Sequence, residues 1–190
     1  MSPQRSNRAE LLEGTLRCLE RLPPEQITAR AIAAESGANL ASIAYHFGSK
    51  DGLVTEAVIL GLDRWLVEIE SALAALGPED PVARFTLAAE AIEATRRRHV
   101  GLARNFLGAL AKAQHDPRVA ALLAEGFRHT RPNVAALLGL GEDQAGLDAA
   151  GLIHSLFTGL LFQQLLEPEL GIEGERLERA KTRLRRVLPE

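Results

Sequence analysis

Between residues 40 and 50 the chain groups side chains that can bind another molecule without making or breaking bonds. Residues 40–42 offer methyl groups and one hydroxyl, which suit the edges of base pairs in a major groove. Tyr45, His46 and Lys50 follow, and each carries a donor that can hold a phosphate oxygen. These groups can act together only if the backbone holds them on one exposed face.

Two short helices joined by a tight turn are predicted to provide that face. Thr28 is a good N-cap, because its hydroxyl can accept from a free backbone N–H of the first helical turn. Gly37 is expected to end the first helix, since glycine enters the left-handed conformation without a Cβ penalty. Asn39 caps the second helix, in which Ile43 and Phe47, four residues apart, share the inward face. The outward face is left to Leu40, Ala41, Ser42, Tyr45 and His46.

This pattern is typical of a helix-turn-helix, whose second helix enters the major groove of DNA. The alternative is an αα-hairpin inside a helical bundle, with Tyr45 and His46 merely solvated. Gly48 is predicted to break the second helix, and Ser49 to cap a further helix that begins at Lys50.

The segment GANLASIAYHFGSKDGL resembles the recognition segment of the TetR-type (tetracycline-repressor-like) transcriptional regulators. The residues that match the family pattern are Gly37, Asn39, Tyr45, His46, Phe47, Ser49 and Lys50. The resemblance is specific over residues 6–55, and beyond them only the helical plan and the total length agree. It implies a double-stranded DNA operator, and we expect contacts from Arg30, Asn39, Leu40, Ala41, Ser42, Tyr45, His46 and Lys50.

Two positions depart from the family pattern. Gly52 stands where Glu or Ala is frequent, so no capping box closes on Ser49. Ala44 stands where a larger residue such as Asn or Tyr is common, and this removes one side chain that could contact DNA.

Composition does not by itself favour DNA as a partner. The chain has 190 residues, is 46% apolar and carries a formal net charge of −3. Residues 1–52 hold as many acidic as basic side chains, so only the motif argues for DNA. A neutral domain can still bind DNA if its basic groups share one face. The single cysteine, Cys18, excludes an intrachain disulfide.

We expect a cytoplasmic protein without a membrane segment. The N-terminus lacks the apolar core of a signal peptide. Residues 149–166 carry no formal charge and reach the lower length limit for a membrane span. Polar side chains within them favour a buried helix of a soluble protein: His154, Ser155, Thr158, Gln163 and Gln164.

Helical periodicity predicts an all-α protein of about nine helices. A first helix, capped by Ser6 and reaching Leu22, completes a three-helix DNA-binding domain over residues 1–50. Residues 51–190 are expected to form a larger helical domain for ligand binding and dimerisation, as in the family. Its helices are predicted at about 50–76, 81–98, 100–113, 117–138, 142–167 and 173–188, with Pro132 kinking one of them near Arg128.

The stretch from residue 54 to residue 160 holds more bulky apolar side chains than one connector helix needs. With a few polar groups beside them, such side chains are typical of a small-molecule site, and a plain core is the alternative. The predicted site for an unidentified small apolar effector consists of Trp65, Phe85, Ile92, His99, Asn105, Phe106, Phe127, His154 and Phe157. A ligand wedged against the helix over 50–76 would tilt it and change the spacing of the two recognition helices in a dimer.

The helix over 142–166 is apolar nearly all round, so both of its faces need cover. Gly151, Ser155 and Gly159 recur every four residues and form a small-residue ridge that lets another helix come close. We expect a homodimer with a four-helix interface, to which Leu177 and Leu184 of the last helix also contribute. Periodicity alone equally allows a helix crossing within one chain.

No catalytic, cofactor or metal site is predicted, so we do not expect an enzyme. The five histidines are scattered without ligand spacing, and the chain has no Gly-x-Ser-x-Gly motif or glycine-rich phosphate loop. Three function classes remain: a ligand-responsive dimeric repressor, a DNA-binding protein that answers to a protein partner, and a dimeric helical binding module that lacks DNA affinity.

Overall fold

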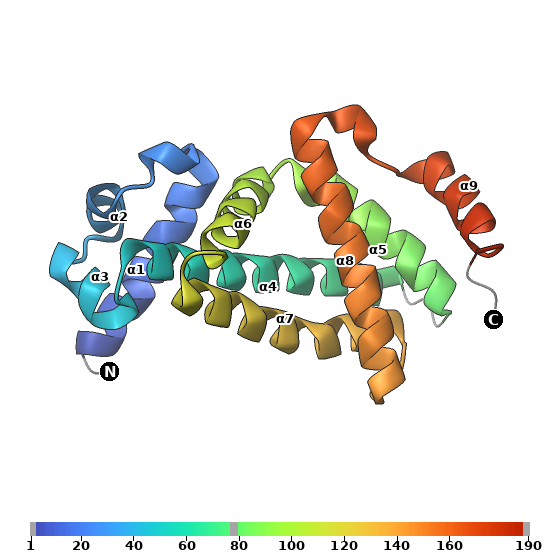
Figure 1. Cartoon of the computed structure of the whole chain (residues 1–190), viewed down its shortest axis with the longest axis horizontal. Coiled ribbons are helices and arrows are strands. Elements are labelled where there is room, and N and C mark those ends of the chain that lie inside the picture. Colours follow the sequence, from blue (N-terminus) through green and yellow to red (C-terminus); the bar gives the residue numbers. More distant parts are fainter. Residues whose placement is uncertain (1–2, 77–79, 188–190) are drawn as a thin grey trace. The chain divides into compact units, whose positions relative to one another are not determined.

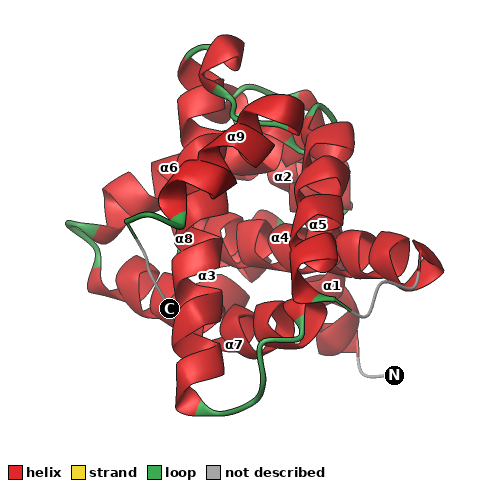
Figure 2. Cartoon of the chain, turned by 90° about the vertical axis from the view of Figure 1, so that its right-hand side faces the viewer, coloured by secondary structure: helices red, strands yellow, loops and turns green. Residues whose placement is uncertain are grey.

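A computed structural model of the chain describes residues 3–76 and 80–187, and within these ranges every regular element is a helix (Figures 1 and 2). This confirms the predicted all-α class. Nine of the described elements are α-helices: α1 (Pro3–Arg21), α2 (Ala29–Ser36), α3 (Leu40–Phe47), α4 (Lys50–Leu76), α5 (Pro81–Arg96), α6 (Val100–Ala113), α7 (Pro117–Leu138), α8 (Gln144–Leu166) and α9 (Gly174–Leu184). Short 3-10 helices cover Pro24–Gln26 and Pro168–Leu170.

The helix boundaries follow the local signals with one clear difference at the N-terminus. The first helix begins at Pro3, ahead of the predicted cap at Ser6, because proline is well tolerated in a first helical turn. Pro132 lies inside α7, which continues to Leu138, so the kink near Arg128 stays a prediction. The last helix ends at Leu184, before the predicted residue 188, which lies outside the described part of the chain.

Contacts divide the chain into two compact units, residues 1–68 with 98–130 and residues 69–97 with 131–190. The first unit holds α1 to α3, α6 and the first parts of α4 and α7; the second holds α5, α8, α9 and the remainder of α4 and α7. The functional boundary at residue 50 stays a prediction.

Apolar residues from four helices form the core of the first unit. Leu11 and Leu19 of α1, Ile32 of α2, Phe47 of α3 and Leu53 of α4 are all fully buried. Burying a side chain of this size contributes about 1.5–3 kcal/mol before entropy is counted. The core therefore fixes α3 against α1 and α4 and leaves the opposite face of α3 to solvent.

Candidate DNA-binding interface

The turn between α2 and α3 is built as the sequence predicts. The hydroxyl of Thr28 accepts from the backbone N–H of Ala31, and the side chain of Asn39 accepts from that of Ala41. Gly37 ends α2 in the left-handed region, with φ +68°. Since each helix is capped by its own sequence, the start of α3 is held in one orientation.

α3 presents the expected face to solvent. Ile43 and Phe47 are buried, whereas Leu40 is 47% exposed and Tyr45 is 72% exposed. Ala41 is exposed as well, and Ser42 and His46 are half-buried. An exposed leucine and tyrosine on an eight-residue helix are available for a partner. Tyr45 and His46 are in edge-to-face contact, with ring centroids 4.8 Å apart.

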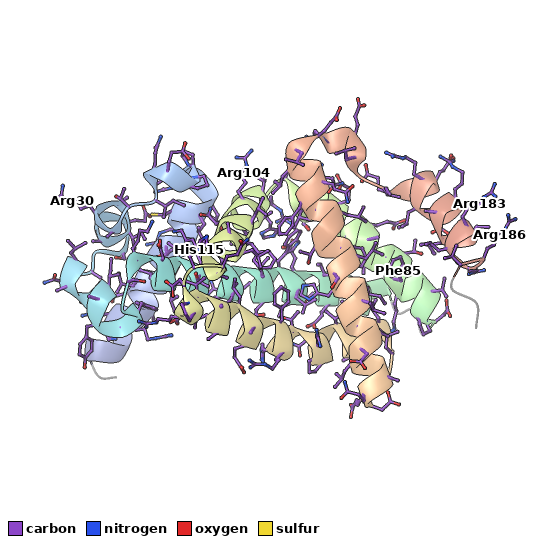
Figure 3. All side chains as sticks on the ribbon, viewed as in Figure 1. Arg30, Phe85, Arg104, His115, Arg183 and Arg186 are labelled. Atoms are coloured by element: carbon purple, nitrogen blue, oxygen red, sulfur yellow. The ribbon has the colours of Figure 1, made fainter. Side chains whose placement is uncertain are left out.

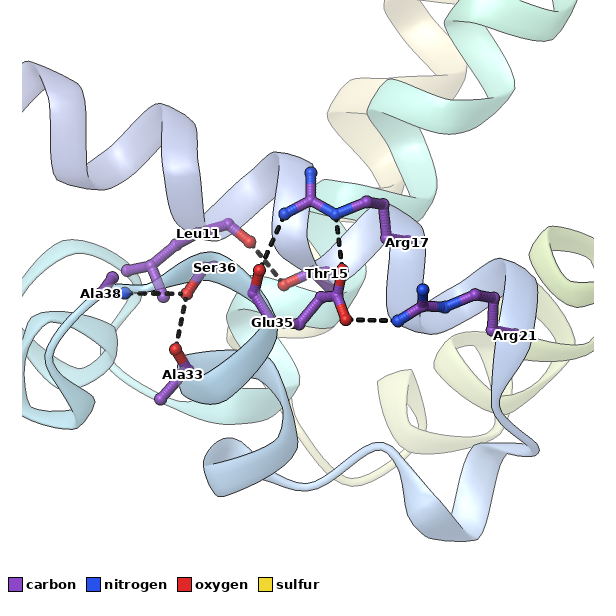
Figure 4. Close-up of polar contacts among 8 residues, drawn as sticks. All are labelled: Leu11, Thr15, Arg17, Arg21, Ala33, Glu35, Ser36 and Ala38. Atoms are coloured by element: carbon purple, nitrogen blue, oxygen red, sulfur yellow. Dashed lines mark hydrogen bonds and ion pairs between the residues drawn. The ribbon is translucent and has the colours of Figure 1, made fainter.

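A charged cluster ties α1 to α2 (Figure 4). Arg17 donates through Nε to Oε1 of Glu35, at 2.7 Å, and through Nη2 to the backbone carbonyl of Glu35, at 2.8 Å. Arg21 donates to the other carboxylate oxygen of Glu35. The hydrogen bond from Arg17 and the charges of both arginines hold the pKa of Glu35 below its usual value. Both arginines are therefore committed to positioning α2.

Lys50 is the first residue of α4, shortly after α3, and its ammonium group lies close to a carboxylate. Its Nζ lies 3.1 Å from Oδ1 of Asp51, and the same oxygen accepts from Lys112 of α6. Burial disfavours the charged form of Asp51, but the hydrogen bonds from Lys112 and Lys50 outweigh it, so the pKa of Asp51 lies below its usual value. Asp51 thus remains ionised and joins the start of α4 to α6.

Few basic groups near α3 remain uncommitted. Arg8 of α1 pairs with Glu56 and lies over the ring of Phe47, with Cζ 5.1 Å from the centroid. Arg30 in the first turn of α2 is exposed and extends from the surface (Figure 3). Of the predicted DNA contacts, Arg30 and Lys50 supply the fixed positive charge, and Asn39 is an exposed cap.

A small cleft of about 90 Å³ opens beside the start of α4. Its walls come from the loop before α2, from α4 and from α6, and among the lining residues are Ile27, Lys50, Asp51, Arg104 and Lys112. The first unit therefore connects α6 to the DNA-facing helices through side chains rather than through chain connectivity alone.

Comparison with known proteins decides between the helix-turn-helix and the plain helical hairpin. The model of the family described as "Bacterial regulatory proteins, tetR family" matches residues 11–57, which cover most of α1, all of α2 and α3, and the start of α4. The chain is also 29% identical to the HTH-type transcriptional regulator BetI of Yersinia pestis over 165 residues, or 85% of this chain and 82% of that protein. Residues 11–57 are therefore a TetR-type helix-turn-helix segment. The chain is accordingly a DNA-binding transcriptional regulator, and the family is one of regulators rather than enzymes.

Solved structures of transcriptional regulators share the fold over most of their length. A TetR transcriptional regulator from Rhodococcus sp. RHA1 has a TM-score of 0.68 at 16% identity, covering 89% of this chain and 91% of that one. A transcriptional regulator from Saccharomonospora viridis, solved in complex with choline, has a TM-score of 0.57 at 24% identity, covering 84% and 85% of the two chains. The shared fold therefore extends well beyond the helix-turn-helix.

Six of the predicted effector residues fall into three aromatic pairs. In the first unit, Trp65 is buried and stacks on His99, with ring centroids 4.7 Å apart, and the rings of Phe106 and Phe127 are 5.9 Å apart. The buried amide of Asn105 donates to the carbonyl of Gly101.

In the second unit, the rings of Phe85 and Phe157 are 5.3 Å apart, and Ile92 is half-buried. Burial, with the nearby charge of Arg131, lowers the pKa of His154. The structure thus brings these residues together in pairs within each unit, and one site shared by all of them stays a prediction.

Sequence reasoning missed two acidic residues beside the effector set. Glu68 of α4 lies one turn after Trp65, and its Oε2 lies 3.0 Å from Nε2 of His99. Asp63, also on α4, has a pKa raised by burial, an effect that the charge of His129 partly offsets. A carboxylate three residues from a buried tryptophan was the available signal for Glu68. Within the described ranges no group of three or more His, Cys, Asp or Glu could hold a metal ion.

The predicted dimer residues on α8 and α9 differ in exposure. Leu177 is buried, whereas Leu184 is 46% exposed. Ser155 is exposed, and a Cβ on Gly159 would meet no atom of the described part of the chain within 4 Å. A Cβ on Gly151 would meet the guanidinium of Arg131, so this residue faces α7 within the chain. Leu152, on the open side of α8, is 75% exposed.

Among the described helices, α8 alone is long and apolar enough to cross a membrane, by length and composition only. Little of it is buried within one chain. A single copy therefore does not cover both faces of α8, and the predicted cover by a second copy stays a prediction.

Proposed function

We propose that this chain is a homodimeric repressor that binds a palindromic operator and is released by a small, largely apolar effector. The main support for this proposal is the exposed face of α3, a helix that is capped by Asn39 and followed by Lys50. Leu40 and Ala41 would contact thymine methyl groups and Ser42 a base edge, while Tyr45, His46 and Lys50 would hold phosphates with Arg30. In this account the chain acts in the cytoplasm and has no catalytic role.

The exposed side of α8 supports the homodimer. Leu152, Leu156 and Leu166 are all exposed, and the open space at Gly159 would let a second helix approach closely. A second copy of α8, with α9 beside it, would cover this surface in a two-fold interface. Two recognition helices would then read two half-sites about 34–36 Å apart, or a multiple of that distance.

The stacked Trp65 and His99 support an effector that works through α4. His99 precedes α6, and Trp65 and Glu68 lie on α4, which begins at the DNA-contacting Lys50. A ligand that inserts between these aromatic groups would displace α4 and change the distance between the two recognition helices, which would then no longer match the two half-sites. Choline in the Saccharomonospora viridis relative makes it the first compound to try, alongside apolar compounds. A hundredfold loss of operator affinity needs about 2.7 kcal/mol of coupling, within the usual allosteric range.

Trp65 is the only tryptophan of the chain and lies in the predicted effector site, so its fluorescence can report ligand binding. Choline and a panel of apolar compounds are titrated while Trp65 emission and the anisotropy of labelled DNA from beside the gene are followed in the same samples. We expect at least one compound to change the emission saturably and to release the DNA over the same concentration range. Saturable quenching without release would mean a pocket without a switch, and a protein partner would then become the leading candidate for the signal.

A further inference from the structure

The first turn of α7 lies against the turn between α3 and α4. The side chain of Arg118 occupies the space beside Gly48 into which any Cβ would project. Figure 1 shows the start of α7 next to the start of α4, and an ion pair joins Lys112, near the end of α6, to Asp51 in the first turn of α4. His115 lies in the turn between α6 and α7 (Figure 3). The end of α6 and the start of α7, which lie outside the helix-turn-helix, therefore contact Asp51 and Gly48 on either side of Lys50.

The guanidinium of Arg118 is exposed and uncommitted. Most described arginine side chains of the first unit pair with a carboxylate: Arg8, Arg17, Arg21, Arg64, Arg98 and Arg128. For Arg118 the described residues provide no ion pair, and Asp116 accepts from its backbone N–H instead. Two other described arginines of the first unit are exposed and form no ion pair with a described residue: Arg30, on the predicted DNA-facing side, and Arg104.

The position of Gly48 explains why this uncommitted charge matters. Gly48 lies between Phe47 and Ser49, so Tyr45 and His46 precede it closely and Lys50 follows it by two residues. A side chain packed on Gly48 is thus within a few ångströms of the backbone that holds the predicted phosphate contacts. A long, planar guanidinium is well suited to a phosphate, because it can donate two parallel hydrogen bonds.

We propose that Arg118 is a DNA-phosphate contact supplied by α7, from outside the helix-turn-helix. The inference rests on DNA binding by α3 and adds a second segment to the protein–DNA interface. We do not assign this role to Lys112, because its ammonium group lies closer to Asp51, at 2.5 Å, than that of Lys50, at 3.1 Å. DNA bound in this way would bridge α3 and α7, so a displacement of α7 would reach the DNA directly as well as through α4.

Arg118→Gln tests the charge, and Arg128→Gln is the matched control on the same helix, since Arg128 pairs with Glu125. Binding to a selected operator and to unrelated DNA is measured at several salt concentrations. We expect Arg118→Gln to weaken both about tenfold and to lower the salt slope by about 0.9, whereas Arg128→Gln leaves the slope unchanged. Arg118→Lys should recover most of the slope. A wild-type slope for Arg118→Gln, or an Arg118→Lys slope as low as that of Arg118→Gln, overturns the proposal.

A tethered cleavage reagent locates residue 118 directly. Cys18 is buried and burial raises the pKa of its thiol, so an iron chelate attached to an Arg118→Cys variant labels that position selectively. We expect strand cleavage just outside each half-site, and none from a chelate at an Arg128→Cys variant. Binding without cleavage from position 118 overturns the α7 contact but leaves the function of α3 intact. Absence of DNA binding by the unmodified chain would instead remove the proposed function.

Discussion

Among single residues, ion pairs with carboxylates determine which basic side chains are available to bind DNA. Glu35 engages Arg17 and Arg21, Glu56 engages Arg8, and Asp51 shares its oxygen between Lys50 and Lys112. The balance of charge in residues 1–52 therefore hides an uneven distribution, because much of the positive charge is neutralised on the side of α1 and α2. Arg30 and the partly paired Lys50 remain for phosphate.

Lys50→Ala should weaken binding to every DNA sequence and lower the salt slope by about 0.9, because one phosphate contact is lost. The loss is uniform across sequences, since a phosphate carries no base identity. Anisotropy titrations on operator and unrelated DNA check this, with Lys181→Ala as control because Lys181 pairs with Glu178 in the second unit. If the two variants bind alike, Lys50 does not contact DNA.

Acidification should destabilise the fold through His154. Burial lowers its pKa in the folded chain, so the unfolded chain takes up a proton first as the pH falls. The contribution of His154 to stability is fully present above the unfolded value near 6.5 and is lost as the pH falls toward the folded value. The free energy of unfolding in urea, measured between pH 7.5 and 5, should fall less for His154→Gln. Equal pH dependence in both chains would show that His154 does not carry this effect.

At the scale of elements, the caps of α2 and α3 set the geometry of the interface. Asn39→Ala should lower the free energy of unfolding by about 1 kcal/mol, because the N–H of Ala41 loses its acceptor. DNA affinity should fall with it, since the first turn of α3 holds the base contacts. Asn39→Ser keeps a capping oxygen and should retain most of both. Thermal melts and operator titrations of the three chains check this, and a serine variant as weak as the alanine variant would contradict capping as the cause.

These caps also show what the sequence can predict. Thr28, Gly37 and Asn39 act within a few residues of their own positions, so the helix-turn-helix could be read from short-range chemistry. The predicted start of α1 at Ser6 was wrong, because the helix already begins at Pro3, and proline is as compatible with a first helical turn as serine is with a cap. The Asp51–Lys112 pair and the packing of Arg118 on Gly48 join residues more than 60 positions apart, and no local pattern encodes such contacts.

Considering the molecule as a whole, the exposed apolar side of α8 is the surface on which we propose that a second copy binds. Gly159→Trp should give monomers, because the indole would block the approach of the partner helix. A Cβ at this position meets no atom of the described residues within 4 Å, so the fold should survive. Sedimentation at micromolar concentration, with circular dichroism for folding, checks both. A folded variant that stays dimeric would contradict the interface, and flotation with lipid vesicles would reveal whether a membrane covers α8 instead.

Selection of bound genomic fragments shows whether the face of α3 reads a palindromic DNA sequence. The purified chain is incubated with sheared DNA from its own organism at about 0.15 M salt, and retained fragments are sequenced. We expect a few enriched fragments that share an inverted repeat. The enrichment should be lost for Leu40→Glu, because the carboxylate would face the bases. Uniform recovery of fragments, or the same enrichment with Leu40→Glu, would contradict it.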